Sequence, residues 1–174
     1  MTARWLMTAL LIGGSSAAAA DPVFVDAEAP LRNYHVVSDR LGTGGTLSAD
    51  AVSWLAADGY RLIVDLRDEF DEIEANAALA QGLSYVHVPV SSQAPSDAEL
   101  EAFLLTMASN PEKKILVHCV SNRRASVMTY LYRVLELDAD PDKAMADVRA
   151  IWEPSKTWLS FIARSIDTRA SVTK

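Results

Sequence analysis

The segment ILVHCVSNRRAS, residues 115–126, lies near the middle of the chain. Its first residues form an apolar run that is typical of a buried strand, and this run leads into Cys119, the only cysteine of the chain. Two arginines follow, and residues 124–137, RASVMTYLYRVLEL, have the apolar spacing of an amphipathic helix. The segment therefore predicts a strand, a short loop with a free thiol, and a helix that begins at the arginines.

Apolar runs alternate with helical patterns on both sides of this segment. Such alternation predicts an α/β fold, with a mainly parallel central sheet flanked by helices. Strands are expected at residues 34–37, 60–66, 83–90 and 114–118. Helices are expected at 48–58, 71–81, 96–109, from the arginines onward, at 140–152, and from Pro154, whereas the glycine-rich residues 41–48 are expected to form a turn.

The composition fits one compact domain and limits the partners. The chain has 174 residues, of which 50% are hydrophobic, and it shows no repeat or long linker. Its formal net charge of −7 argues against nucleic acid and anionic membrane surfaces as partners. Any anion-binding site must therefore depend on a local cluster of positive or hydrogen-bond-donating groups. We also expect a monomer.

The first twenty residues have the pattern of a signal peptide. Arg4 precedes an apolar stretch over residues 5–12, and small residues follow up to Ala20. The apolar stretch is far shorter than the ~20 residues that span a bilayer. We therefore expect cleavage after Ala20, a periplasmic or secreted protein, and a single mature domain over residues 21–174 without a membrane span.

The position of Cys119 favours a reactive thiol. A lone cysteine cannot form an internal disulfide, and the reactive crevice of an open α/β sheet lies beyond the carboxyl ends of its strands. The amides of a tight loop and the start of a helix would bind an anion there and favour thiolate over thiol. Arginine suits such a site because its planar guanidinium can bind two oxygens of a tetrahedral oxyanion.

HCVSNRRAS resembles the active-site loop of the cysteine-dependent protein tyrosine and dual-specificity phosphatases, in particular small bacterial forms with a short loop. The family pattern is His-Cys, a five-residue spacer, Arg, and then Ser or Thr. The likeness extends over roughly residues 31–165, including LIVDLR and YVHVPV. It implies a dual-specificity phosphatase-like fold and hydrolysis of a phosphorylated protein or small molecule through a phosphocysteine at Cys119, without metal or cofactor.

The loop can be aligned with the family pattern in two registers, which differ in the position of the arginine. Counting from Cys119, the family arginine falls on Ala125, whereas this chain has Arg123 and Arg124. In one register the loop is a residue shorter and Arg124 binds the oxyanion. In the other, Ser126 keeps the hydroxyl position and the arginine is lost to Ala125. We favour the short loop, because Arg124 then points inward while Arg123 faces solvent.

The remaining residues of the loop are assigned to substrate binding. The resemblance implies that His118 orients the loop by hydrogen bonding and that Val120, Ser121, Asn122 and Arg123 surround the substrate. Asn122 stands where the family usually has glycine, and asparagine tolerates a left-handed backbone better than most residues.

The general acid is not identified by the sequence. The resembling enzymes have an aspartate after the strand that corresponds to YVHVPV, but Ser91, Ser92 and Gln93 occupy that region here. Asp65, Asp68 and Asp97 are the candidates. His35 and His87 are too scattered to predict a metal site, and none is assigned.

Two other functions are compatible with the same residues. Rhodanese-type sulfurtransferases also carry a cysteine on a short loop after a strand, and the six residues from Cys119 to Arg124 match that loop length. A pseudophosphatase that binds phosphate without hydrolysing it would follow if Ala125 took the arginine position.

Overall fold

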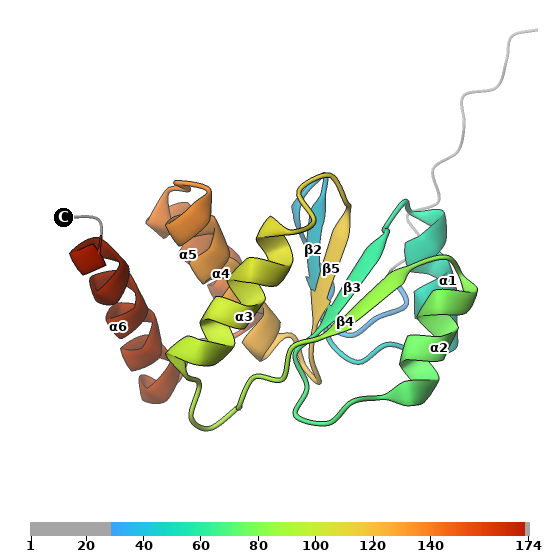
Figure 1. Cartoon of the computed structure of the whole chain (residues 1–174), viewed down its shortest axis with the longest axis horizontal. Helices are drawn as coiled ribbons and strands as arrows, with labels where there is room; N and C mark the ends of the chain where they lie inside the picture. Colours follow the sequence, from blue (N-terminus) through green and yellow to red (C-terminus); the bar gives the residue numbers. More distant parts are fainter. Residues whose placement is uncertain (1–28, 173–174) are drawn as a thin grey trace, which may run out of the picture.

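The computed structural model describes residues 29–172 and shows a five-stranded sheet between helices (Figure 1). The strand order is β1-β2-β5-β3-β4; β1 is antiparallel to β2, and the other neighbouring strands are parallel. The predicted α/β class with a mainly parallel sheet is therefore confirmed. The strands are β1 His35–Ser38, β2 Leu41–Gly44, β3 Leu62–Asp65, β4 Ser84–His87 and β5 Ile115–His118. The helices are α1 Ala49–Ala57, α2 Glu72–Ala80, α3 Asp97–Ala108, α4 Arg123–Glu136, α5 Pro141–Ile151 and α6 Lys156–Val172.

Helices cover both faces of the sheet. In Figure 1, α1 and α2 lie on one side of the strands and the helices from α3 to α6 on the other. Because successive side chains of a strand point to opposite faces, Ile63 and Leu116 pack with the α1 and α2 side. Their neighbours Leu62, Val64 and Val117 pack with the larger helical layer. Both faces of the central strands are thus buried, as their continuous apolar sequences require.

The glycine-rich residues 41–48 do not form the expected turn throughout, because their first four residues form β2. This strand lies between β1 and β5, where neighbouring side chains and backbone approach it closely. A Cβ atom on Gly42 would lie 2.2 Å from the Tyr60 hydroxyl, and one on Gly45 would lie 2.9 Å from the Arg32 carbonyl. The glycines therefore permit close packing beside the central strand.

Helix starts follow the capping residues of the sequence. Ser48 accepts a hydrogen bond from the Ala51 amide at the start of α1, and Ser96 and Glu99 form a reciprocal capping box at α3. Asp140 caps α5, in which Pro141 is the first residue. The last helix begins at Lys156, slightly later than Pro154. No helix within residues 29–172 is long and apolar enough to cross a membrane, and the predicted signal peptide lies outside these residues.

Candidate active site

Cys119 lies directly after β5, at the carboxyl end of the parallel strands. Its side chain is free of disulfide bonds and buried, and its amide donates to the Gly44 carbonyl at 3.3 Å. The residue nevertheless contributes to the wall of a cavity of about 490 Å³ that also contains Arg123 and Arg124. The thiol is therefore recessed within a concave site.

The loop after Cys119 is held by its carbonyl groups. The Val120 carbonyl accepts from the Thr46 amide at 3.2 Å and from the Thr46 hydroxyl at 3.0 Å, and the Ser121 carbonyl accepts from Asn33 Nδ2 at 3.1 Å. In a trans peptide the C=O and N–H groups point in opposite directions, so the Ser121 amide faces away from Thr46. No hydrogen bond within residues 29–172 takes up the amides of Val120, Ser121 or Arg124. These donors, together with the start of α4, are available to an anion.

Asn122 sets the direction in which the loop enters α4. It has left-handed backbone angles, with φ 66°, as the sequence predicted. Its buried side chain donates from Nδ2 to the Asn33 carbonyl at 2.6 Å and to the Thr43 hydroxyl at 2.9 Å. Asn122 thus supplies the backbone freedom that glycine would give and also ties the loop to β2.

The two arginines differ in their surroundings. Arg124 is buried, and its Nη1 donates to Asp68 Oδ2 at 2.9 Å and to the Val90 carbonyl at 2.7 Å. Arg123 is exposed, with its guanidinium 5.3 Å from the ring centre of Trp152. Ala125 is fully buried in the core and is not among the residues that line the cavity. These positions favour the short loop ending at Arg124, which stays a prediction.

Of the three aspartates considered as acids, only Asp68 lines the cavity. Asp65 is fully buried and bound to Arg67, and Asp97 lies at the start of α3, where its carboxylate pairs with Arg164. The Asp68 side chain is 62% exposed, so it is accessible to a ligand.

A buried network lies behind the loop. Arg67 donates to both oxygens of Asp65 at 2.9 Å and to Glu74 Oε1 at 2.7 Å, and the Tyr85 hydroxyl lies 2.7 Å from Asp65 Oδ2. His118 Nε2 is 3.0 Å from Glu74 Oε1, although this approach lacks hydrogen-bond geometry. His118, next to Cys119, thus faces a carboxylate at the start of α2.

Arg67 neutralises part of the negative charge of this network. Burial alone would raise the pKa of Asp65, but hydrogen bonds from Arg67 and the charge of His118 outweigh burial and lower it. Burial and the nearby carboxylates raise the pKa of Tyr85, which keeps it neutral. Asp65, Glu74 and His118 are also the one group among the described residues that could offer three metal ligands. Because Arg67 already binds both carboxylates, its guanidinium provides the positive charge that a metal would otherwise supply.

Several wall residues were not predicted as site residues. Trp152, Ser155 and Trp158 line the cavity from the segment after α5, and Ser92 lines it from the loop after β4. Trp158 Nε1 donates to the Ser92 carbonyl at 3.3 Å, which joins these two walls. No local pattern distinguishes these tryptophans from core residues, so only the tertiary structure reveals their position.

Comparisons with known proteins find relatives of part of the chain. Two Xylella fastidiosa proteins named Beta-lactamase hydrolase-like protein are each 33% identical over 107 residues, which cover 58% of this chain and 25% of theirs. The chain thus spans about a quarter of the length of these curated relatives.

Solved structures share the fold at lower identity. A DUF442 protein of Shewanella putrefaciens has a TM-score of 0.70 at 23% identity, covering 80% of this chain and 95% of its own. The catalytic domain of the PP-IP phosphatase SIW14 from S. cerevisiae has a TM-score of 0.67 at 18% identity, covering 77% of this chain and 85% of its own.

The family described as DSP-PTPase phosphatase fused to NAD+ Kinase matches residues 31–157, which include the whole loop from Cys119 to Arg124. The resemblance found in the sequence is confirmed over most of its extent. The chain belongs to this family of phosphatases with a dual-specificity-like fold.

Proposed function

We propose that the protein hydrolyses phosphate monoesters of the phosphotyrosine or dual-specificity class, with Cys119 as the nucleophile. The observation that carries the proposal is the convergence at one cavity of a free thiol, uncommitted loop amides and the Arg124 guanidinium. Preorganised donors of this kind stabilise the charge that develops on a transferring phosphoryl group.

Arg124 has donors left for an oxyanion. Both of its protein hydrogen bonds come from Nη1, and within residues 29–172 neither Nε nor Nη2 has a partner. A guanidinium donates through Nε and Nη2 in parallel, which matches two oxygens of a phosphoryl group. The bonds from Nη1 to Asp68 and Val90 hold the side chain in place, so little side-chain entropy is lost on binding.

The reaction proceeds in two displacements. The Cys119 sulfur attacks phosphorus, the bond to the leaving oxygen breaks, and protonated Asp68 gives its proton to that oxygen. Water then attacks the phosphocysteine, Asp68 takes a proton from the water, and the S–P bond breaks to release phosphate and the thiolate. Asp68 is chosen because it alone among the three candidate acids lines the cavity.

The experiment uses p-nitrophenyl phosphate under reducing conditions. Wild-type protein is expected to release phosphate, and Cys119→Ser is expected to abolish the release. Arg124→Ala should lower the rate far more than Arg123→Ala. Phosphate release that persists in Cys119→Ser would overturn the assignment of the nucleophile.

Sulfur transfer is the second candidate, favoured by the six-residue loop from Cys119 to Arg124. A smaller ring suits a terminal persulfide sulfur better than a phosphoryl group. Thiocyanate formation from thiosulfate and cyanide, without phosphate release, would establish this reading. Phosphate-analogue binding with neither activity would instead indicate a pseudophosphatase.

Export and the monomeric state stay as predictions from the sequence. In an oxidising compartment the Cys119 thiol would be prone to sulfenic acid or mixed disulfide formation. Cys119 is only 1% exposed, and its burial in the cavity wall limits access by large thiols.

A further inference from the structure

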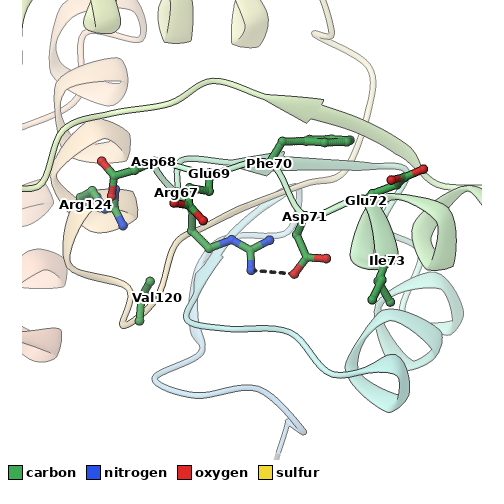
Figure 2. A pocket seen from close by; sticks show the side chains of 9 residues that line it. All are labelled: Arg67, Asp68, Glu69, Phe70, Asp71, Glu72, Ile73, Val120 and Arg124. Atoms are coloured by element: carbon green, nitrogen blue, oxygen red, sulfur yellow. Dashed lines mark hydrogen bonds and ion pairs between the residues drawn. The ribbon is translucent and has the colours of Figure 1, made fainter.

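A second hollow adjoins the candidate active site. This hollow, which we call the side groove, has a volume of about 670 Å³ and runs along residues 67–73, which comprise the β3–α2 connection and the first two residues of α2. It shares Asp68, Val120 and Arg124 with the cavity of Cys119. Figure 2 shows Arg124 and Asp68 together at one end and Glu72 and Ile73 at the other. A substrate bound at Cys119 can therefore extend into the side groove.

The side groove carries unbalanced negative charge. Glu69 and Glu72 are exposed, and within residues 29–172 neither forms an ion pair with a cation. Asp71 pairs with Arg67 at 3.3 Å, but the same guanidinium is already bound by two buried carboxylates. Arg124 pairs with Asp68 at the end nearest Cys119. The part of the groove beyond this pair is thus acidic.

Apolar side chains lie among these acids. Phe70 is 55% exposed, Ile73 84% and Val120 49%. The Phe70 ring is supported edge-on by Tyr85, with ring centres 6.1 Å apart. Large apolar side chains exposed together beside a cavity are typical of a surface that binds a ligand.

We propose that the side groove binds the residues flanking a phosphorylated side chain, and that the preferred substrate is a phosphoprotein segment with basic and apolar flanks. This inference rests on the proposed function, since the phosphoryl group is the part bound at Cys119. Lysine or arginine pairs with Glu69 and Glu72, while an aliphatic neighbour packs on Phe70 and Ile73. A polyphosphorylated small molecule or nucleotide is disfavoured, because its further phosphates would lie against carboxylates.

The test compares two phosphotyrosyl peptides that are identical except for their flanks, one with Lys and Leu and one with Glu and Leu. At low salt, the basic peptide should have the higher kcat/KM by about fivefold, since each of two carboxylates contributes a factor of about two to three at water-screened separations. Rising salt should reduce this ratio. The same two peptides are titrated against Cys119→Ser protein to compare their Kd values without catalysis.

Variants assign the preference to the side groove. The double variant Glu69→Gln/Glu72→Gln should bring the ratio between the peptides close to one. The control Glu112→Gln/Asp167→Asn changes the net charge equally at exposed sites outside the groove and should keep the full ratio.

The outcomes separate this inference from the proposed function. Equal or better use of the acidic peptide, or an unchanged ratio in Glu69→Gln/Glu72→Gln, overturns the inference while the phosphatase assignment stands. If no monoester is hydrolysed, the phosphatase assignment fails, and the Kd values still decide the inference: equal affinity for both peptides would overturn it.

Discussion

Replacing Arg124 with alanine tests the short-loop geometry. The substitution removes Nε and Nη2, the two donors left free for an oxyanion. A hydrogen bond to a charged group contributes about 1.5–3 kcal/mol, so two of them in the transition state correspond to roughly 3–4 kcal/mol if they are partly compensated by water. Since each 1.36 kcal/mol is a factor of ten, kcat/KM is expected to fall by about 10²–10³.

Arg123→Ala is the matched control, because it removes the same side chain from the neighbouring position. Its contact with Trp152 contributes about 0.5–1 kcal/mol at an exposed site, so kcat/KM should change by less than about tenfold. Both variants are assayed with p-nitrophenyl phosphate, and their folding is compared by thermal unfolding. A larger loss in Arg123→Ala than in Arg124→Ala would refute the reasoning.

Three further predictions follow from the described contacts. Asp68→Asn should lower kcat about 10²-fold for alkyl phosphates and much less for p-nitrophenyl phosphate, because the p-nitrophenolate leaving group needs no proton. The assay is a series of substrates whose leaving groups rise in pKa. An equal loss of kcat across this series would exclude the role of Asp68 as the acid. Asp65→Asn should destabilise the protein by about 1–3 kcal/mol near neutral pH, because the half-buried Arg67 loses one of its three carboxylate partners and keeps Glu74 and Asp71. The folded-state pKa of Asp65 is lowered, so the stability that its carboxylate contributes is present above the unfolded pKa of about 3.9 and is lost as pH falls through the folded pKa. Denaturant titrations should therefore show the unfolding free energies of wild type and variant converging at low pH. A constant difference between these free energies down to about pH 2 would contradict this. Gly42→Ala should lower the free energy of unfolding by about 1–3 kcal/mol, because the added methyl group meets the Tyr60 hydroxyl. Adding Tyr60→Phe should recover part of this loss. A double-mutant cycle by urea unfolding measures the coupling between the two positions, and zero coupling would contradict the contact.

Local patterns in the sequence predict most of the fold. Ser48, Ser96 and Asp140 cap the helices that follow them, and apolar runs mark four of the five strands. The exception is β2, because its glycines are also typical of turns. The close approach of Tyr60 to Gly42, which explains the glycine there, is a tertiary contact that the local sequence does not show. Strand order depends on such non-local contacts as well.

The candidate site likewise has one part that the sequence predicts and another that only the tertiary structure shows. The residues from His118 to Arg124 are contiguous, so their pattern alone predicts the loop. The carboxylate facing His118 comes from Glu74, and the cavity wall includes Trp158, which is 39 residues after Cys119 in the numbering. Residues so distant have no shared sequence period, and only the sheet topology brings them together. The sequence left Asp68 as one of three candidate acids, and its position at the cavity is known only from the structure.

The chemical state of Cys119 during turnover tests the account most directly. Protein mixed with excess phosphate monoester is quenched rapidly in acid, digested, and analysed by mass spectrometry for the peptide that contains Cys119. The account predicts a phosphoryl group on the Cys119 sulfur that disappears as substrate is consumed. Turnover of the monoester with Cys119 unmodified throughout, or with phosphate on another residue, would contradict it.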